Sequence, residues 1–411
     1  MQTYENQYNL RVANELKVLT ALKSGPKSLN DLAEKLGVSF TAVSKIIDQM
    51  VESNLVKRVN KKVKTLKRGR IPTFVKLDTS VGVTAAIDLS TSSLKVAVSD
   101  LTGKIIVYDE VSAGDVVTEE KFVQISEVLK ELLKRPEVEN RRLLGICISS
   151  PGMVNKYNGE YGVVFKIKTH NNLSPINYFF NEFGVPVNLY NDVKLGMIAE
   201  KMYGVVPLDA KDYMFIHIGN GCGVSFSFNG KLYQGKNGFC GELTNLIPSA
   251  HCEKNYLYGF VHFMTKIEEL DPSLNVRLPN GTPNKEKIAE LYNADNEVVV
   301  KAIDYYLEKN AQQVIAYNDL LDFEYIIFEG GINLFGEKAR TKFLNYIATL
   351  DTVEFRAKIL FSNFKETPSS LLGAIYQANN IYYLNRLEEI TNQRSSAGGH
   401  YDISEAFGNN I

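Results

Sequence analysis

The sequence predicts an α/β chain that begins with a small helical head and continues as a larger module of alternating strands and helices. Its 411 residues are enough for two or three domains. Positive charge gathers between Lys57 and Lys76, where no acidic residue occurs, whereas both signs mix after Val81. Apolar residues recur at helical spacing before this basic segment, and short apolar runs separated by helical patterns follow it.

The composition is that of an ordinary globular protein, with 45% hydrophobic and 23% charged residues. The formal net charge is −1, so any nucleic-acid interface must be a local basic patch. Four cysteines without a Cys-x-x-Cys pair disfavour a disulfide framework and favour a reducing compartment. We find no signal-peptide pattern and no apolar run long enough for a bilayer, and therefore expect a cytoplasmic protein without a membrane partner.

The head, residues 1–78, is predicted to contain three helices followed by a hairpin. Helical periodicity covers Leu10–Lys23. Ser28 is a suitable N-cap for a short second helix, and Ser39 is one for a third, with Gly37 in the turn between them. Two helices joined by a short turn that contains glycine are typical of a helix-turn-helix.

The third helix and the hairpin predict how the head contacts duplex DNA. Leu55–Val59 and Thr73–Leu77 are expected strands, which makes the basic segment a wing whose Arg68 and Arg70 could enter a minor groove. A recognition helix needs an apolar back and a short polar front. The residues expected at the DNA on this helix are Ser39, Thr41, Ser44, Lys45 and Gln49. The alternative is a protein-interaction module with a solvated charge run, but the helix pattern and the charge coincide.

The second module is predicted to have two lobes within residues 79–385. The first lobe covers about 79–190 and the C-terminal helix, the second about 191–370, and a tail follows at 386–411. The expected strands are Gly82–Asp88, Leu94–Ser99, Leu144–Ser149, Val187–Tyr190, Met214–Ile218, Val224–Phe228 and Tyr325–Phe328. The expected helices are Glu120–Lys134, Ser174–Phe183, Asp192–Tyr203 and Val298–Leu320.

Short motifs occur along the chain in a fixed order. They are G-R-I-P (Gly69–Pro72), V-T-A-A-I-D-L-S-T-S (Val83–Ser92), S-S-P-G-M-V-N (Ser149–Asn155), N-L-Y-N-D-V-K-L-G-M-I-A-E (Asn188–Glu200), I-G-N-G-C-G-V (Ile218–Val224), N-G-K-L-Y-Q-G-K-N-G-F-C-G-E-L-T-N (Asn229–Asn245) and F-E-G-G-I (Phe328–Ile332). From Leu10 to about Tyr383 the chain resembles the ROK family of repressors and sugar kinases, in particular its repressor branch. The resemblance implies a winged helix-turn-helix followed by a two-lobed actin-like, sugar-kinase-like (ribonuclease H-like) module.

The resemblance also implies where ATP would bind in a kinase of this family. The family's first phosphate turn reads D-x-G-G-T, but here Ser90 and Thr91 replace both glycines and crowd a close backbone approach. The second turn, I-G-N-G-C-G-V, keeps its glycines with Asn220 at a usual threonine position, and Gly330-Gly331 forms the third. Asp192 matches the family's catalytic base. We therefore expect a module without kinase activity, in which Asp192 is a vestigial base.

Sugar hydroxyls both donate and accept hydrogen bonds, so their sites use carboxylates and amides. By resemblance, Asn191, Asp192 and Glu242 would bind the sugar, and Asn245 stands where the family's G-E-x-G-H ends in histidine. Taken outside the motif, either carboxylate could instead be a helix cap or a solvated charge.

Much of the family binds structural zinc with that histidine and three cysteines. Here Asn245 replaces the histidine and only Cys252 of the three cysteines remains. Tetrahedral zinc requires four nitrogen or sulfur ligands. An alternative set would be Cys240, His251, Cys252 and His262, but its spacing matches no familiar pattern. We expect neither a metal nor a cofactor.

These observations favour a DNA-binding regulator, a repressor of sugar metabolism, that senses a monosaccharide or sugar phosphate and binds duplex operator DNA. The alternatives are an active ATP-dependent kinase with Asp192 as base, and a constitutive DNA binder with a purely structural second module. We expect a homodimer or homotetramer, because paired heads bind pseudo-palindromic sites. The sugar, the operator sequence and the direction of the response stay open.

Overall fold

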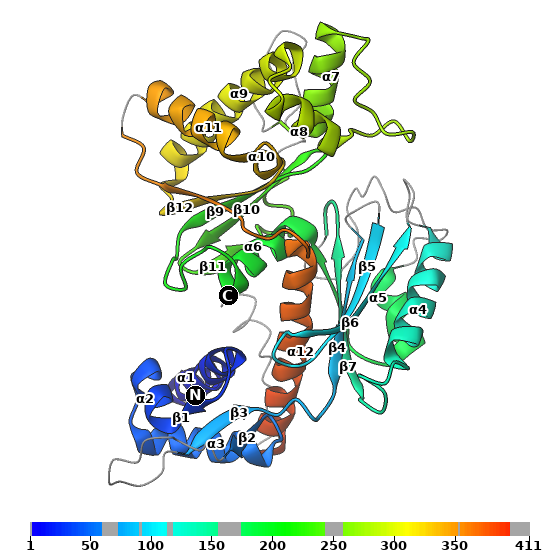
Figure 1. Cartoon of the computed structure of the whole chain (residues 1–411). Helices are drawn as coiled ribbons and strands as arrows, with labels where there is room; N and C mark the ends of the chain where they lie inside the picture. Colours follow the sequence, from blue (N-terminus) through cyan, green and yellow to red (C-terminus); the bar gives the residue numbers. More distant parts are fainter. Residues whose placement is uncertain are drawn as a thin grey trace, which may run out of the picture. The chain divides into compact units, whose positions relative to one another are not determined.

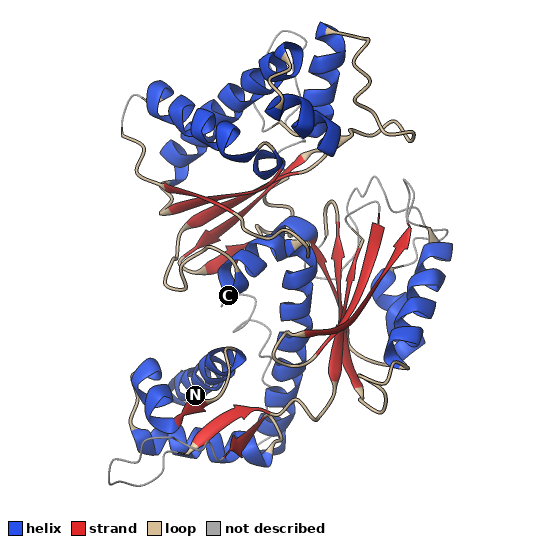
Figure 2. Ribbon diagram, in the orientation of Figure 1, coloured by secondary structure: helices blue, strands red, loops and turns tan. Residues whose placement is uncertain are grey.

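The computed structural model describes residues 2–59, 73–89, 93–112, 118–154, 174–242, 258–351 and 354–394, and all statements below concern these residues. The chain divides into two compact units (Figures 1 and 2). The first unit comprises Met1–Ser149, Lys168–Leu189 and Ala374–Asn409. The second comprises Ser150–Ile167, Tyr190–Gly373 and Asn410–Ile411.

The head of the first unit is a winged helix-turn-helix, as the sequence predicts. Its elements are α1 (Gln2–Lys23), β1 (Lys27–Ser28), α2 (Leu29–Leu36), α3 (Phe40–Glu52), β2 (Val56–Val59) and β3 (Phe74–Leu77). The three short strands pair antiparallel in the order β1-β3-β2. Val43, Ile47 and Met50 on one face of α3 are buried against this core.

Local side chains begin and end the head helices where the sequence predicts. The Ser28 hydroxyl accepts from the Asp31 amide at 3.1 Å, and the Asp31 carboxylate accepts from the Ser28 amide at 3.1 Å, which is a capping box. Gly37 ends α2 with φ +66, a conformation that favours glycine. Ser39 caps α3 by accepting from the Ala42 amide at 3.2 Å.

The remainder of the first unit is a five-stranded sheet with helices on both faces. Its order is β6-β5-β4-β7-β8. The strands are β4 (Val83–Asp88), β5 (Ser93–Ser99), β6 (Ile105–Ser112), β7 (Leu143–Ser150) and β8 (Val187–Asn191). Figure 1 shows α4 (Glu119–Leu133) and α5 (Pro175–Phe183) on one face and α12 (Ser369–Arg394) on the other. Every residue of the central strand β4 is therefore buried.

The second unit repeats the strand order of the first sheet. Its order is β11-β10-β9-β12-β13, with β9, β10 and β11 antiparallel and β12 parallel to β9 and β13. The strands are β9 (Tyr213–Ile218), β10 (Cys222–Phe228), β11 (Lys231–Tyr233), β12 (Tyr325–Gly330) and β13 (Lys358–Phe361). This duplicated α/β topology agrees with the two-lobed module that the sequence predicts.

Helices also cover both faces of the second sheet, with α6 on one face and α7 to α11 on the other (Figure 1). Their bounds are α6 (Asp192–Tyr203), α7 (Phe260–Leu270), α8 (Lys285–Asn293), α9 (Glu297–Leu321), α10 (Gly331–Leu334) and α11 (Gly336–Leu350). The core beneath α7 to α11 is rich in fully buried aromatic rings, including Phe260, Phe263, Tyr292 and Phe335.

The structure also contains elements that the sequence patterns did not reveal, namely β1, β6, β11, β13, α7, α8, α10 and α11. Helix α12 continues to Arg394, past Arg386, where the sequence analysis placed the start of a tail. Within the described residues, no helix combines the length and the apolar character needed to cross a membrane.

Helix α12 joins the head to the first sheet within the first unit. The Lys23 ammonium, at the end of α1, donates to the Asn380 side chain at 3.0 Å and lies 3.4 Å from the centre of the Tyr376 ring. The Tyr383 hydroxyl donates to the Leu101 carbonyl at 3.1 Å. Both Tyr383 and Leu101 are buried in the same apolar cluster as the head core. The head and the sheet therefore share one continuous core through α12.

Candidate functional site

Two of the predicted sugar-binding residues, Asn191 and Asp192, stand at the start of α6 in the second unit. Asn191 is the N-cap, and its side-chain oxygen accepts from the Lys194 amide at 3.1 Å. Its side-chain nitrogen donates to the Gly152 carbonyl at 2.9 Å, and the residue is only 5% exposed. Asn191 thus fixes the start of α6 against the Gly152 turn and sets the position of the residue that follows it.

Asp192 is the first residue of α6 and is partly exposed. Its carboxylate accepts from the Val193 amide at 2.9 Å, and the helix N-terminus favours a negative charge at this place. A Cβ on Gly223 would lie 2.4 Å from a Val193 methyl carbon, so α6 packs directly on β10. The absence of a side chain at Gly223 therefore lets the first turn of α6 pack closely on β10.

Glu242 is held near the same helix by a turn that only glycine can form. Gly241 has φ +97, and a Cβ there would lie 1.9 Å from the Val224 carbonyl oxygen. Glu242 is half-buried, and burial raises the pKa of its carboxyl while the charge of Lys194 opposes that rise. Lys194 itself is buried and donates to the Gly238 carbonyl. The first turn of α6 therefore supplies both Asp192 and the cation that acts on Glu242.

Two of the predicted phosphate turns meet at one edge of the second sheet. The carbonyls of Gly219 and Asn220 accept from the first two amides of α7, each at 3.0 Å. Gly330 has φ +87, and a Cβ there would lie 2.3 Å from the last carbonyl of β9. A Cβ on Gly331 would lie 2.4 Å from the Phe260 ring. Both glycines are thus required by close packing, whether or not a ligand binds.

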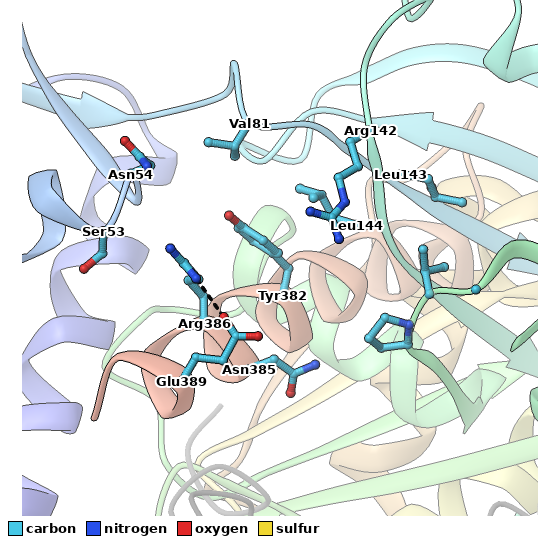
Figure 3. A pocket seen from close by; sticks show the side chains of 13 residues that line it. Ser53, Asn54, Val81, Arg142, Leu143, Leu144, Tyr382, Asn385, Arg386 and Glu389 are labelled. Carbon is cyan, nitrogen blue, oxygen red and sulfur yellow. Dashed lines mark hydrogen bonds and ion pairs between the residues drawn. The ribbon is translucent and has the colours of Figure 1, made fainter. Parts of the chain in front are cut away.

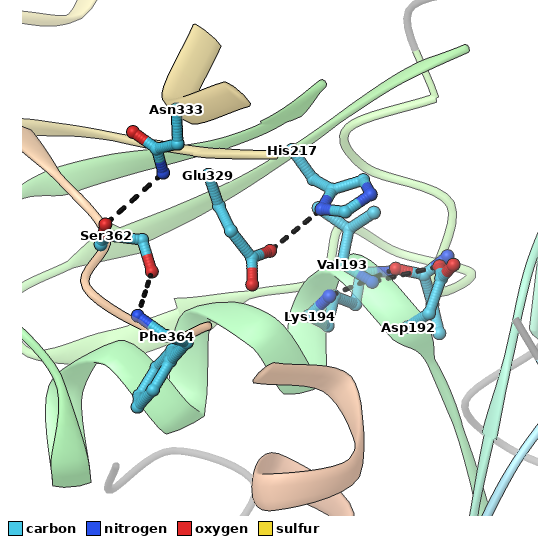
Figure 4. A network of polar contacts seen from close by, with 9 residues as sticks. Asp192, Val193, Lys194, His217, Glu329, Asn333, Ser362 and Phe364 are labelled. Atoms are coloured by element: carbon cyan, nitrogen blue, oxygen red, sulfur yellow. Dashed lines mark hydrogen bonds and ion pairs between the residues drawn. The ribbon is translucent and has the colours of Figure 1, made fainter. Parts of the chain in front are cut away.

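An ion pair between a half-exposed histidine and a buried glutamate stands directly before these turns and was missed by the sequence analysis. His217 on β9 and Glu329 on β12 are opposite one another in the parallel ladder, and His217 Nδ1 lies 2.7 Å from Glu329 Oε2 (Figure 4). Glu329 is 8% exposed, and it also accepts from the amide and hydroxyl of Ser369. A histidine and a glutamate inside otherwise apolar strands were the available signal.

The pKa values of this pair are shifted toward the charged forms. Burial alone would raise the pKa of Glu329, but the bonds from His217 and Ser369 hold it below its usual value. Burial would lower the pKa of His217, but Glu329 and, to a smaller extent, Asp192 raise it. The end of the sheet that carries the two glycine turns therefore holds an ion pair whose opposite charges offset one another.

The predicted DNA-reading residues lie together on α3. Thr41 and Lys45 are exposed, and Ser44 and Gln49 are partly exposed. The Ser39 hydroxyl is the N-cap of the helix. The sequence analysis missed two neighbours on the same helix, Phe40, which is 52% exposed, and Asp48, which forms an ion pair with Arg58 of β2. Arg68 and Arg70 lie outside the described residues.

Other predicted site residues are only partly covered. Ser90, Thr91, Asn245, His251 and Cys252 lie outside the described residues. Of the alternative zinc set, Cys240 is a half-buried free thiol whose pKa is raised by burial. The His262 ring packs edge-on against Tyr258 with 5.1 Å between ring centres. Over the part of the chain that the structure describes, no three histidine, cysteine or acidic side chains are grouped as a metal site would require.

Comparison with known proteins agrees with this architecture. The ROK family model matches residues 84–255, and the model of the N-terminal domain of methanogenesis regulatory protein FilR1 matches residues 11–83. The chain carries a ROK-family domain. A solved ROK family transcriptional regulator, a homologue of the Escherichia coli MLC protein, has a similar fold, with a TM-score of 0.73 and 18% identity. That similarity covers 94% of this chain and 99% of the other.

Curated relatives of this chain include both repressors and kinases. The xylose repressor of Caldicellulosiruptor bescii is 26% identical over 243 residues, which are 58% of this chain and 59% of that protein. The β-glucoside kinase of Listeria monocytogenes is 26% identical over 298 residues, which are 71% of this chain and 96% of that protein. The match to the xylose repressor thus spans about three-fifths of its length.

Proposed function

We propose that this ROK-family protein is a DNA-binding transcriptional regulator, a repressor of sugar metabolism, that responds to a monosaccharide or a sugar phosphate. The observation that carries the proposal is the joint presence of two sites in one chain. One is the capped helix α3, with an exposed polar front. The other is the first turn of α6, where Asp192 and Lys194 lie with the carboxyl of Glu242 nearby. The repressors among its relatives support the same function.

In this proposal α3 enters the major groove of duplex operator DNA. Lys45 and Gln49 contact base edges, Thr41 and Ser44 contact the backbone or bases, and Arg68 and Arg70 of the wing contact phosphates or the minor groove. A homodimer or homotetramer would place two heads on the half-sites of a pseudo-palindrome.

The effector would bind at α6. Asp192 and Glu242 accept hydrogen bonds from sugar hydroxyls, and Asn191 and Asn245 complete the polar set. Ligand binding would shift the protein between forms with different operator affinity, because a ligand favours the form that it binds better.

An active sugar kinase is the second candidate, because Asp192 is retained and the match to β-glucoside kinase spans nearly all of that enzyme. Phosphoryl transfer would bring ATP phosphates to the glycine turns. Ser90 and Thr91, which replace both glycines of the first phosphate turn, support a domain without kinase activity.

Selection of duplexes from a random DNA library with the full chain tests the head. We expect a recurring sequence to be enriched, and Lys45→Ala with Gln49→Ala to reduce the preference for it over scrambled DNA by about tenfold or more. Lys35→Ala, an exposed change on α2, is the matched control and should leave the preference unchanged. Equal binding of selected and scrambled duplexes by the wild-type chain at moderate salt would contradict the proposal.

Thermal shift with a panel of sugars and sugar phosphates tests the effector site, because a ligand of the native state raises the midpoint. The effective compound should also change operator affinity, and Asp192→Asn should remove both responses. An ADP-release assay with the same compounds and MgATP separates the two candidates. Sustained turnover that Asp192→Asn abolishes would favour the kinase.

A further inference from the structure

A pocket of about 330 Å³ lies within the first unit, where the head, the first sheet and α12 meet (Figure 3). The turn after α3, with Ser53 and Asn54, forms the head side. The start of β7 and the segment before β8 form the sheet side, and the last turns of α12 complete it. We refer to this space as the junction pocket. Its volume suits a small metabolite.

Two arginines face the junction pocket from different elements. Arg142 directly precedes β7 and Arg386 lies on α12, and both carry their guanidinium groups toward Tyr382 (Figure 3). Burial raises the pKa of the Tyr382 hydroxyl, and Arg386 and Arg142 both oppose that rise, so both cations act on one atom. A site that holds two cations beside a hydroxyl is suited to an oxyanion.

The acidic groups around the pocket pair with only one of these two arginines. Glu389 pairs with Arg386 at 2.7 Å. Asp78, the other carboxylate that acts on Tyr382, pairs with Lys57 at 2.8 Å. Arg142 forms no ion pair and no side-chain hydrogen bond with any other described residue, and it is exposed. The local charge balance therefore favours an anion next to Arg142.

Apolar residues also line the pocket, namely Leu144, Val185 and Pro186. Side-chain amides of Asn54 and Asn385 lie at its rim. We propose that the junction pocket binds a small metabolite that carries a carboxylate or phosphate group, with Arg142 as its principal partner and its carbon body against the apolar wall. This site is separate from the residues of the proposed sugar site, all of which belong to the second unit.

Such a ligand would contact the head, the sheet and α12 at once. It would stabilise the arrangement in which the head is docked on the sheet through Lys23, Tyr383 and their partners. The occupied pocket would therefore change operator affinity. That consequence rests on the proposed function, whereas the binding of the anion does not.

Calorimetric titration of the full chain with inorganic phosphate, malonate and glycerol 3-phosphate tests the pocket, with potassium chloride at matched ionic strength as the reference. We expect at least one probe to bind above the chloride reference. If phosphate and glycerol 3-phosphate bind and malonate does not, the ligand class is a phosphate ester. If only malonate binds, the ligand class is a carboxylate. No binding of any probe at millimolar concentration would overturn the proposal.

Substitutions then locate the site. Arg142→Ala should weaken binding about tenfold or more, since it removes a charge-assisted contact, and Arg142→Glu should abolish it. Arg141→Ala changes the exposed neighbouring arginine, which does not line the pocket, and should bind as the wild type does. Arg142 is exposed, so these variants should keep the wild-type melting temperature. Unchanged affinity in both Arg142 variants would overturn the assignment.

The sugar site is tested independently in the same samples. Asp192→Asn should leave anion binding unchanged, because Asp192 belongs to the other unit. A wild-type chain that binds the anion and responds to no sugar or sugar phosphate would support the pocket and contradict the proposed effector site. A wild-type chain that responds to a sugar and binds no anion would support the effector site and contradict the pocket.

Discussion

Helices α3 and α6 begin in the same way but lie in different environments. Each starts with a polar N-cap, Ser39 for α3 and Asn191 for α6, whose side chain accepts a backbone amide. The first turn of α3 then faces solvent, whereas nearly every residue of α6 is buried. The surroundings of α6 also hold charged groups from distant segments, among them Glu242 and the His217–Glu329 pair.

The difference shows how much each site depends on the rest of the fold. The front of α3 is arranged by contacts within a few residues, so its side chains can change with little effect on stability. The site at α6 depends on partners more than forty residues away, such as Lys194 with Gly238. Substitutions at α6 should therefore change stability and ligand binding together. Substitutions on the front of α3 should change DNA binding and leave stability nearly unchanged.

The largest effect is expected from Glu329→Gln. The change removes the charge that holds His217 and the Ser369 amide, and breaking a fully buried pair costs about 3–5 kcal/mol. Because the His217 side chain is 40% exposed, we expect the free energy of unfolding to fall by about 2–3 kcal/mol. Urea denaturation measures it. Glu337→Gln on α11, a carboxylate with 82% exposure, is the control and should change stability little.

The same pair predicts a pH dependence. Its charged partners coexist best between the ordinary pKa values of glutamate and histidine, 4.5 and 6.5. The pKa of His217 is raised, so its contribution is lost as pH rises through that raised value. The pKa of Glu329 is lowered, so its contribution is lost as pH falls through that lowered value. The stability difference between wild type and Glu329→Gln should therefore be largest at mildly acidic pH. A difference that stays constant from about pH 5 to 9 would contradict the ion pair.

Lys194→Met should have a smaller effect on stability and a specific effect on Glu242. The change leaves the Gly238 carbonyl without its donor, and we expect a loss of about 1–2 kcal/mol. Without the opposing cation, the pKa of Glu242 should rise further above its usual value. Titration of the Glu242 carboxyl by NMR measures that shift. Lys194→Arg keeps the positive charge and should therefore leave the pKa of Glu242 close to its wild-type value. An unchanged Glu242 titration would show that Lys194 only fills space.

The sequence predicted the parts of this molecule that are fixed by neighbouring residues. The caps at Ser28 and Ser39, the glycine at the end of α2 and the strands β2 and β3 follow from short patterns, and all are confirmed. The strands β6 and β13 were missed because most of their residues are exposed or half-buried, which weakens the apolar pattern.

The residues of the candidate site were predicted one by one from the family resemblance. The interactions between its charged groups could not be predicted from the sequence. Nothing in the sequence places His217 opposite Glu329, since the two are 112 positions apart and meet only through the β9–β12 register. The effect of Lys194 on Glu242 likewise requires the Gly241 turn to press against β10. Roles for Asn191, Asp192, Glu242 and Asn245 in sugar binding stay predictions.

The smallest effect on stability is expected at α3. Ser39→Ala removes the N-cap and should lower the stability of the head by about 1 kcal/mol, whereas Thr41→Ala should change it by no more than about 0.5 kcal/mol because that side chain is exposed. Both should reduce operator affinity, Ser39→Ala through loss of the helix start and Thr41→Ala through loss of a contact. Thermal unfolding and fluorescence anisotropy with the selected duplex separate the two causes. A Thr41→Ala chain as destabilised as Ser39→Ala would show that the front of α3 is built into the fold, as α6 is, and the contrast between the two helices would fail.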